Sequence, residues 1–308
     1  MGKMIPSGTI NIRLTIFSAL VLLVLLSFIG IKYQNSNHDL ENILQKTVKK
    51  NEILSKLRIN LIKESDFEKA AVMADTDELS VALADKAIQI ADIVDSERYE
   101  LRHLIEQDNI LNELSLLREF DTCWEQFRKI DKILLDFAVE NTNVKASALS
   151  FTEGGKALRR FESNMTDLIN NNTTIDDGGK TIKLACDAIM SVLKIQYLHA
   201  PHISASNDSN MDSIETQIVH ADGIVKNSLD QLKNLVSDSN RVLLMEAASA
   251  YNEFMKITDE VLKLSRQNTN IKSFELSLGR KRKIAAECDE ILGSLQEAVR
   301  SRTFDATR

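Results

Sequence analysis

The chain repeats part of its own sequence. Residues 124–151 (WEQFRKIDKILLDFAVENTNVKASALSF) align without a gap on residues 251–278 (YNEFMKITDEVLKLSRQNTNIKSFELSL), and 10 of the 28 positions are identical. Amphipathic helices can match by accident, but the shared turn Asn-Thr-Asn-x-Lys at 141–145 and 268–272 does not follow from helical periodicity. We therefore interpret the chain as a duplication, which restricts the fold to two similar units.

Each unit is predicted to consist of helices. Glycine and proline together account for 12 of the 308 residues and aromatic residues for 5%, which leaves few residues for turns and strands. Apolar residues recur every three or four positions, as at Ile53, Leu57 and Leu61, which is the period of a helix. Breaks rich in Asn, Asp, Ser and Thr separate eight expected helices: 35–74, 78–105, 109–140, 143–169, 180–200, 211–236, 240–267 and 271–302.

The expected fold class is therefore all-α. Short turns join antiparallel neighbours, so four successive helices form one up-and-down bundle. We expect two tandem antiparallel four-helix bundles, at residues 35–172 and 180–302, preceded by one transmembrane helix.

That transmembrane helix is predicted at residues 14–31 (LTIFSALVLLVLLSFIGI). The run has no charged residue, and at about 1.5 Å per residue it is close to the thickness of the hydrocarbon core of a bilayer. A cleaved signal peptide is the alternative, but the end of the run offers no small-x-small cleavage site. An uncleaved anchor is the interpretation we favour.

The charge distribution predicts which side of the membrane the body occupies. The net charge of −7 divides into +3 for residues 1–32 and −10 for residues 33–308. Under the positive-inside rule, residues 1–13 lie in the cytoplasm and the body lies outside a bacterial inner membrane, with a single pass through the lipid. The acidic body lacks a basic stripe with interleaved aromatic residues, which argues against a nucleic-acid partner.

No catalytic or metal-binding pattern is evident. Cys123, Cys186 and Cys288 have neither CxxC nor Cys/His spacing, so we expect buried, unpaired side chains rather than a disulfide framework or a zinc site. His199 and His202 are separated by a proline that is expected to end their helix, and a third ligand is not evident. The sequence predicts no enzyme, no metal site and no cofactor.

The order of these parts resembles the four-helix-bundle sensor domain of bacterial methyl-accepting chemotaxis receptors, which also occurs on sensor histidine kinases. The resemblance rests on the short N-terminus, the first span, the long first helix with ILSKLRINLIKESDFEKAAVMA (53–74), and FDTCWEQFRKIDKILLDFAVENTNVKASAL (120–149), in which an aromatic third helix turns into an Ala-rich fourth. It covers roughly residues 10–170, and the repeat extends it to about 300.

The resemblance implies ligand sensing outside the cell, with the signal carried by small helix displacements. It implies a small anionic ligand, such as an amino acid or another carboxylate, a homodimer, and a signalling partner in the cytoplasm or membrane. Arg58 matches the part of the first helix where arginines of the family face the ligand, and Lys63, Arg159 and Arg160 are further candidates. The alternative for Arg58 is a solvated surface arginine.

The sequence also departs from this family. The family usually has one bundle, followed by a second span, a HAMP linker and a cytoplasmic signalling region, which these 308 residues do not contain. We therefore expect either a truncated or split gene product or a chain that passes its signal to another protein. Two alternatives stay open: an anchored helical bundle that binds partners without sensing a small ligand, and the sensor part of a histidine kinase.

Overall fold

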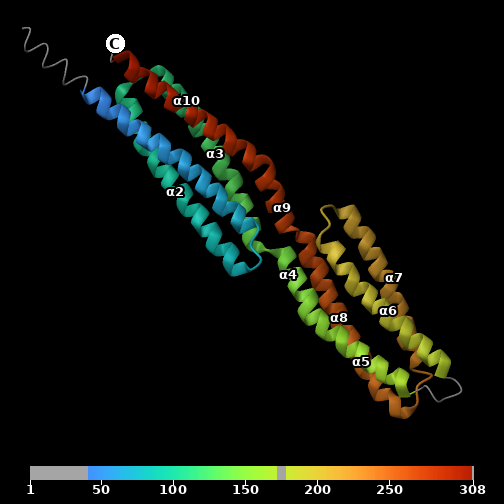
Figure 1. Ribbon diagram of the computed structural model, residues 1–308. Helices are drawn as coiled ribbons and strands as arrows, with labels where there is room; N and C mark the ends of the chain where they lie inside the picture. The colour runs from blue at the N-terminus through green and yellow to red at the C-terminus, as the bar shows by residue number, and fades with distance from the viewer. Residues whose placement is uncertain (1–40, 172–177, 307–308) are drawn as a thin grey trace, which may run out of the picture. The chain divides into compact units, whose positions relative to one another are not determined.

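The computed structural model describes residues 41–171 and 178–306, and this part of the chain is helical throughout apart from short connections (Figure 1). The all-α prediction is confirmed for these residues. The predicted span at 14–31 lies outside the described residues. Among the helices that are described, none has the length and apolar character needed to cross a membrane.

The helix boundaries agree with the predicted ones to within a few residues. The first described helix covers 41–72. The elements that follow are α2 (Asp77–Asp108), α3 (Leu111–Glu140), α4 (Thr142–Leu149), η1 (Ser150–Gly154), α5 (Gly155–Asn171), α6 (Gly178–Ile203), α7 (Asp208–Leu232), η2 (Asp238–Asn240), α8 (Arg241–Gln267), α9 (Thr269–Leu276), η3 (Ser277–Lys281) and α10 (Arg282–Ala306). Here η2 is a 3₁₀ turn, whereas η1 and η3 are short π-helices within otherwise continuous helices.

Three asparagines mark the connections between consecutive helices. Asn109, Asn141 and Asn268 have φ angles of 52°, 54° and 56°, in the left-handed region. Asparagine tolerates this conformation better than most residues, and a single left-handed residue is a common helix ending. The chain changes direction at Asn109 between α2 and α3, whereas at the other two a new helix starts with the next residue.

The chain divides into two compact units. Of the described residues, unit 1 contains those within Met1–Leu61, Asp92–Cys123 and Glu287–Arg308, and unit 2 contains those within Ile62–Ala91 and Trp124–Ala286. In unit 1, segments of the first helix, α2, α3 and α10 bury an aliphatic core that includes Leu57, Leu101 and Leu292. The fully buried Lys50 binds Asp108 (Nζ to Oδ2, 2.7 Å) and Glu113 (Nζ to Oε2, 2.6 Å), which connects the first helix to both sides of the α2–α3 turn.

A disulfide in unit 1 corrects the expectation of three unpaired cysteines. Cys123 of α3 and Cys288 of α10 are bonded, with Cα atoms 5.7 Å apart and a sequence separation of 165. The two lie far apart in the chain, so spacing gave no signal for the pair. Cys186 is free and exposed, which also differs from the predicted burial.

Unit 2 contains a complete four-helix bundle. The helix formed by α4, η1 and α5 packs with α6, α7 and α8 around Phe161, Met165, Val192, Val225 and Phe254. Contacts between elements place α6 next to both α5 and α7, and α5 next to α8. Within this unit, a second group of helices consists of 62–72, the part of α2 up to Ala91, the part of α3 from Trp124, and α9 with η3. There the Ser80 hydroxyl donates to the carbonyl oxygens of Ala71 (3.1 Å) and Ala138 (2.9 Å).

The pairing of helices differs from the predicted tandem bundles at 35–172 and 180–302. The helix at 142–171 packs with α6 and α8, whereas the helix at 269–306 packs with the first helix and α3 through the Cys123–Cys288 and Lys281–Glu64 contacts. The two fourth helices are thus exchanged. The two helices carry the same repeated pattern, so each is compatible with either bundle. The pattern alone therefore did not distinguish tandem bundles from the exchanged arrangement.

The exchange occurs at the repeated Asn-Thr-Asn turn. The Thr142 amide donates to Thr269 Oγ1 (3.1 Å), and the Thr269 amide donates to Thr142 Oγ1 (3.2 Å). Likewise the backbone N–H of Asn143 donates to Asn270 Oδ1 (3.0 Å), and the backbone N–H of Asn270 donates to Asn143 Oδ1 (3.2 Å). These reciprocal bonds satisfy amides at both helix starts, which otherwise lack a partner within the helix. The repeated motif therefore holds the α3–α4 and α8–α9 connections of the chain together.

Candidate functional site

The two π-helices occupy equivalent positions of the repeat. η1 covers Ser150–Gly154 and η3 covers Ser277–Lys281. A short π-helix is a local register change within an α-helix, and such segments frequently occur at functional sites. Each of these two is surrounded by buried polar side chains from neighbouring helices. We treat the two polar centres as the candidate functional site.

The centre at η3 is built around Lys281, whose side chain is 1% exposed. Its Nζ lies 2.7 Å from Glu64 Oε1 and 3.4 Å from Glu68 Oε2, and it also contacts Asp131 Oδ1. The ammonium group lies 4.6 Å from the centroid of the Phe127 ring, a cation–π contact. Lys281, at the end of η3, therefore connects the first helix and α3 through buried contacts.

Three carboxylates face this single ammonium group, so the centre has an excess of negative charge. Burial raises the pKa of Glu64 well above its usual range, and the neighbouring Asp131 raises it further while Lys281 opposes the shift. Burial likewise raises the pKa of Glu68. For Lys281, burial opposes the charged form, but the carboxylates outweigh it and raise its pKa. The arrangement favours a charged lysine that shares the centre with at least one protonated acid.

The centre at η1 is neutral. His199 lies between Ser150 Oγ (2.9 Å from Nδ1) and Thr258 Oγ1 (3.2 Å from Nε2), and Gln196 Nε2 donates to Ser150 Oγ (2.9 Å). The imidazole stacks on the Phe254 ring with centroids 5.9 Å apart. Burial, followed by the nearby His202, lowers the pKa of His199 to about 4. The ring is therefore uncharged at neutral pH.

The two centres occupy the same places in the repeat but use different chemistry. Thr258 is the counterpart of Asp131, and Phe254 is the counterpart of Phe127, so both centres combine a polar α3 or α8 side chain with a phenyl ring. The counterpart of Lys281 is Gly154, which has no side chain to offer. One centre therefore holds its helices by charge and the other by neutral hydrogen bonds.

A third polar contact connects α6, α7 and α8. His202 Nδ1 lies 2.8 Å from Ser265 Oγ, its Nε2 lies 3.0 Å from Glu215 Oε1, and Arg266 Nε donates to the same carboxylate oxygen (2.7 Å). Pro201 lies inside the last turn of α6 rather than ending it, so the expected break at this proline is wrong. Within the described part of the chain, no three His, Cys, Asp or Glu side chains are placed to hold a metal ion.

The four ligand-binding candidates from the sequence have different surroundings. Arg58 forms a two-point contact with Asp289 (Nε to Oδ1, 2.7 Å; Nη2 to Oδ2, 2.9 Å), which holds its pKa above the usual value. Lys63 and Arg159 are exposed, and Arg160 pairs with Glu253 on the surface of α5 and α8. Arg58 thus binds a carboxylate of the chain itself.

Sequence reasoning missed the residues of the charged centre, although a signal for part of it was present. Glu64 and Glu68 continue the spacing of Leu57 and Leu61, so these two acids stand in the buried stripe of the first helix. A charge in a buried stripe requires a partner. Lys281 is 217 residues from Glu64 in sequence, and no local pattern identifies it as that partner.

Comparison with known proteins adds one family. A family described as a four helix bundle sensory module for signal transduction matches residues 12–177, which is more than half of the chain. No curated protein and no solved structure matches the chain.

Proposed function

Because this chain belongs to the family of four-helix-bundle sensory modules for signal transduction, we propose that it senses a small ligand outside the cytoplasm while residues 14–31 anchor it in a membrane. The family match carries this proposal. The basic residues before the apolar run and the acidic body after it support the orientation. The Cys123–Cys288 disulfide is typical of an oxidising compartment and supports the same side for the body.

The proposed signal is a small displacement of α10 against the first helix. These two helices are antiparallel neighbours, joined by the Arg58–Asp289 contact and by a hydrogen bond from Gln296 Nε2 to Ser55 Oγ (3.1 Å). The π-helix η3 precedes α10 and is itself a change of helical register. Lys281 holds that register through its contacts with the buried carboxylates of Glu64, Glu68 and Asp131. A ligand that favours another register would therefore shift α10.

A ligand screen on the full chain in detergent tests the sensing part. Amino acids and dicarboxylates are added one at a time, and the unfolding temperature is measured. A ligand at 100 times its dissociation constant stabilises the protein by about 2.7 kcal/mol. Arg58→Ala should then weaken an anionic ligand by about 1.5–3 kcal/mol if the guanidinium binds it. Silence across the panel with a folded protein favours the partner-binding bundle instead.

Protease digestion of spheroplasts, in which the outer surface of the inner membrane is accessible, tests the membrane orientation. A protease added outside should digest the body and leave an N-terminal tag protected. Protection of the whole chain would contradict the proposed location. This experiment is independent of the ligand screen, so either part of the proposal can fail without the other.

A further inference from the structure

The bundle that contains α5, α6, α7 and α8 has one open side, between α7 and α8. α6 packs along α7 and α5 packs along α8, whereas α7 and α8 contact each other far less. A pocket of about 320 Å³ lies on this open side, beside the turn that joins the two helices, and we call it the α7–α8 pocket. It is lined mostly by apolar residues: Leu229, Val236, Leu244, Met245 and Ala248, with Lys233 and Arg241. This size and composition are typical of a small-molecule site.

The first copy of the repeat joins its helices by an ion pair at the equivalent position. In unit 1, Asp121 of α3 contacts two arginines of α2, Arg98 (Oδ1 to Nη1, 3.1 Å) and Arg102 (Oδ2 to Nη2, 2.5 Å). At the offset of 127 residues, Asp121 corresponds to Ala248 and Arg102 corresponds to Leu229. The second copy therefore has a small and an apolar side chain where the first copy has charges that connect its helices. This difference accounts for the apolar pocket between α7 and α8.

The two charged residues of the pocket are cations, and they lie at one end of it. Lys233 follows the last residue of α7 and Arg241 is the first residue of α8, so both stand beside the turn. Each pairs with an acid three residues before it, Lys233 with Asp230 (Nζ to Oδ1, 2.7 Å) and Arg241 with Asp238 (Nε to Oδ1, 3.2 Å). All four side chains are at least 63% exposed, and exposed pairs contribute little. An ammonium group has three donors and a guanidinium group five, so each cation can bind a further anion.

The apolar part of the pocket extends away from these cations along α8. Leu244, Met245 and Ala248 follow Arg241 by three, four and seven residues, which places them on one face of the helix. Seven helical residues span about 10 Å, which is close to the length of extended octanoate. We propose that the α7–α8 pocket binds a medium-chain aliphatic carboxylate, with its chain along α8 and its carboxylate at Lys233 and Arg241. Such binding does not require the proposed signalling by α10, because the pocket shares no residue with the polar centres.

Photolabelling of the full chain in lipid nanodiscs tests this site. An octanoate analogue with a diazirine near the end of its chain is irradiated with the protein, and the modified residues are identified by mass spectrometry. Labelling should concentrate on α8 between Leu244 and Ala248. Excess octanoate should remove the label, whereas octanol should compete about tenfold less well, because it lacks the charge that strengthens hydrogen bonds to the two cations.

Two variants separate the role of the chain from that of the carboxylate. Ala248→Phe places a phenyl ring in the pocket and should reduce labelling of α8 about tenfold, because the bound chain loses its apolar contacts. The double variant Lys233→Gln, Arg241→Gln should retain labelling by the chain but should make octanoate compete no better than octanol.

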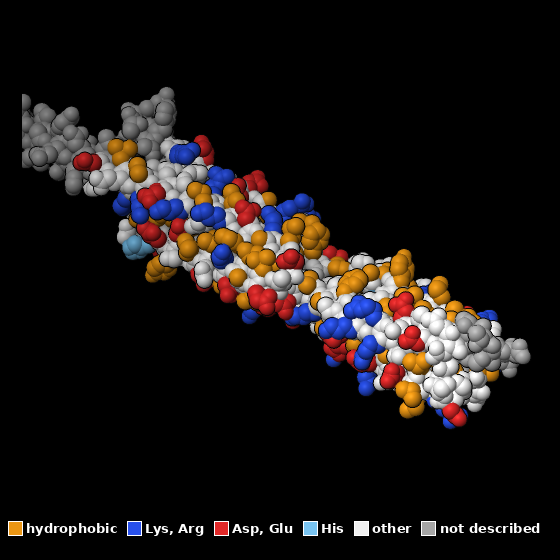
Figure 2. Space-filling model, turned by 60° about the horizontal axis from the view of Figure 1, so that its bottom comes forward, with side chains coloured by type: hydrophobic (Ala, Val, Ile, Leu, Met, Phe, Trp, Pro, Cys, Tyr) orange, Lys and Arg blue, Asp and Glu red, His pale blue; other side chains and the backbone are white. Residues whose placement is uncertain are grey.

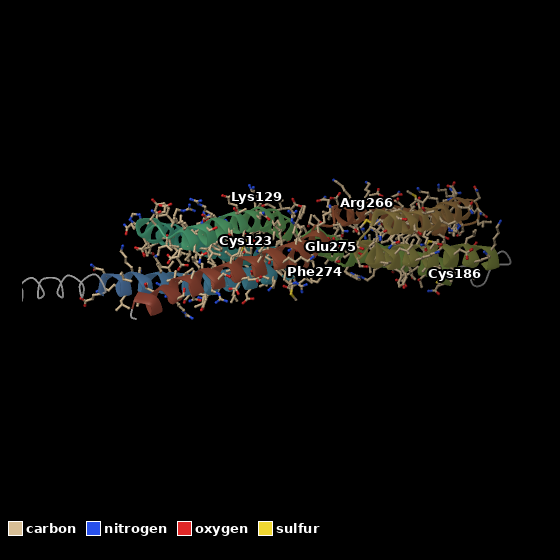
Figure 3. The ribbon with its side chains drawn as sticks, turned by 90° about the horizontal axis from the view of Figure 1, so that it is seen from above. Cys123, Lys129, Cys186, Arg266, Phe274 and Glu275 are labelled. Carbon is tan, nitrogen blue, oxygen red and sulfur yellow. A yellow bond between two sulfur atoms is a disulfide. The ribbon has the colours of Figure 1, made fainter. Side chains whose placement is uncertain are left out.

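Lys263→Gln is the matched control for the loss of charge. Lys263 is 72% exposed on α8 and also pairs with an acid three residues before it, Glu260. It lies three residues from Arg266, which is in the last turn of α8, at the far end from the pocket (Figure 3). This variant should leave both labelling and competition unchanged.

The outcomes test the two parts of the proposal separately. Labelling spread evenly over the helices, or unchanged by Ala248→Phe in a folded protein, would overturn the pocket as a binding site. Equal competition by octanoate and octanol in the parent protein would overturn recognition of the carboxylate. If Ala248→Phe fails to fold, the position of the label and the competition in the parent protein still decide, because neither needs a variant.

Discussion

At the scale of single residues, the charged centre at η3 matters because its members depend on one another. Glu64, Glu68 and Asp131 are buried, and Lys281 is the cation that each of them contacts. Removing one partner from a buried ion pair leaves an uncompensated charge, which costs more than the pair contributes. On the surface visible in Figure 2, by contrast, basic and acidic side chains are interspersed among apolar ones. Exposed ion pairs contribute little to stability.

Replacing Lys281 should therefore destabilise the protein strongly. We expect Lys281→Met to lower the free energy of unfolding by about 3–5 kcal/mol near pH 7.5, measured by urea denaturation. Burial raises the folded-state pKa values of Glu64 and Glu68 above their unfolded values, so the loss should shrink as the pH falls and these two acids become protonated. Lys283→Met is the control, because Lys283 is exposed on the same helix and should change stability by less than about 0.5 kcal/mol. Equal effects of the two variants would contradict the importance of the centre.

His199 should make the protein acid-sensitive. Its folded-state pKa is about 4 because the ring is buried, whereas the unfolded value is near 6.5. The unfolded chain therefore binds a proton first, and the stabilisation present above pH 6.5 is lost as the pH falls towards 4, by about 3 kcal/mol. We expect His199→Gln to lack this component of the acid loss, measured as the difference in unfolding free energy between pH 7 and 4.5. His220→Gln, at an exposed position, should retain the full loss of the parent.

At the scale of helices, periodicity predicted most of the structure and failed where the period changes. The buried stripe of α3, with Phe120, Trp124, Phe127 and Leu134, keeps a regular spacing and was predictable. The π-helices add a residue to one turn, and nothing in their composition distinguishes them. The disulfide was missed for a related reason, since pairing across helices depends on tertiary packing rather than on local pattern.

The disulfide should be a major contribution to the stability of unit 1. It closes a loop of 165 residues, and constraining the unfolded chain over such a length contributes about 2–5 kcal/mol. We expect the double variant Cys123→Ser, Cys288→Ser to lose that amount in thermal or urea unfolding, and reducing agent to have the same effect on the parent. Cys186→Ser should leave stability unchanged, because Cys186 is exposed and unpaired within the chain. Insensitivity of the parent to reduction would contradict the bond.

At the scale of the whole molecule, the exchange of the two fourth helices explains both the success and the failure of sequence reasoning. The duplication made the number and type of helices predictable. It also left open which helices each fourth helix packs against, because residues 142–171 and 269–298 carry equivalent patterns. The structure resolves the ambiguity at Asn141, where one left-handed residue separates α3 from α4, and the reciprocal Thr142–Thr269 bonds hold the crossing.

The exchange predicts which part of the chain folds alone. Residues 142–267 are contiguous and contain α4, η1, α5, α6, α7 and α8, the complete set of helices around the core that includes Phe161 and Phe254. We expect this fragment to give a helical circular-dichroism spectrum and one cooperative thermal transition. Residues 41–171 lack the helix that supplies Lys281 and Cys288, so this fragment should leave Glu64, Glu68 and Asp131 unpaired and fail to unfold cooperatively as a monomer. A cooperative, monomeric 41–171 fragment would show that its own fourth helix folds back, as in two tandem bundles, and would contradict the exchange.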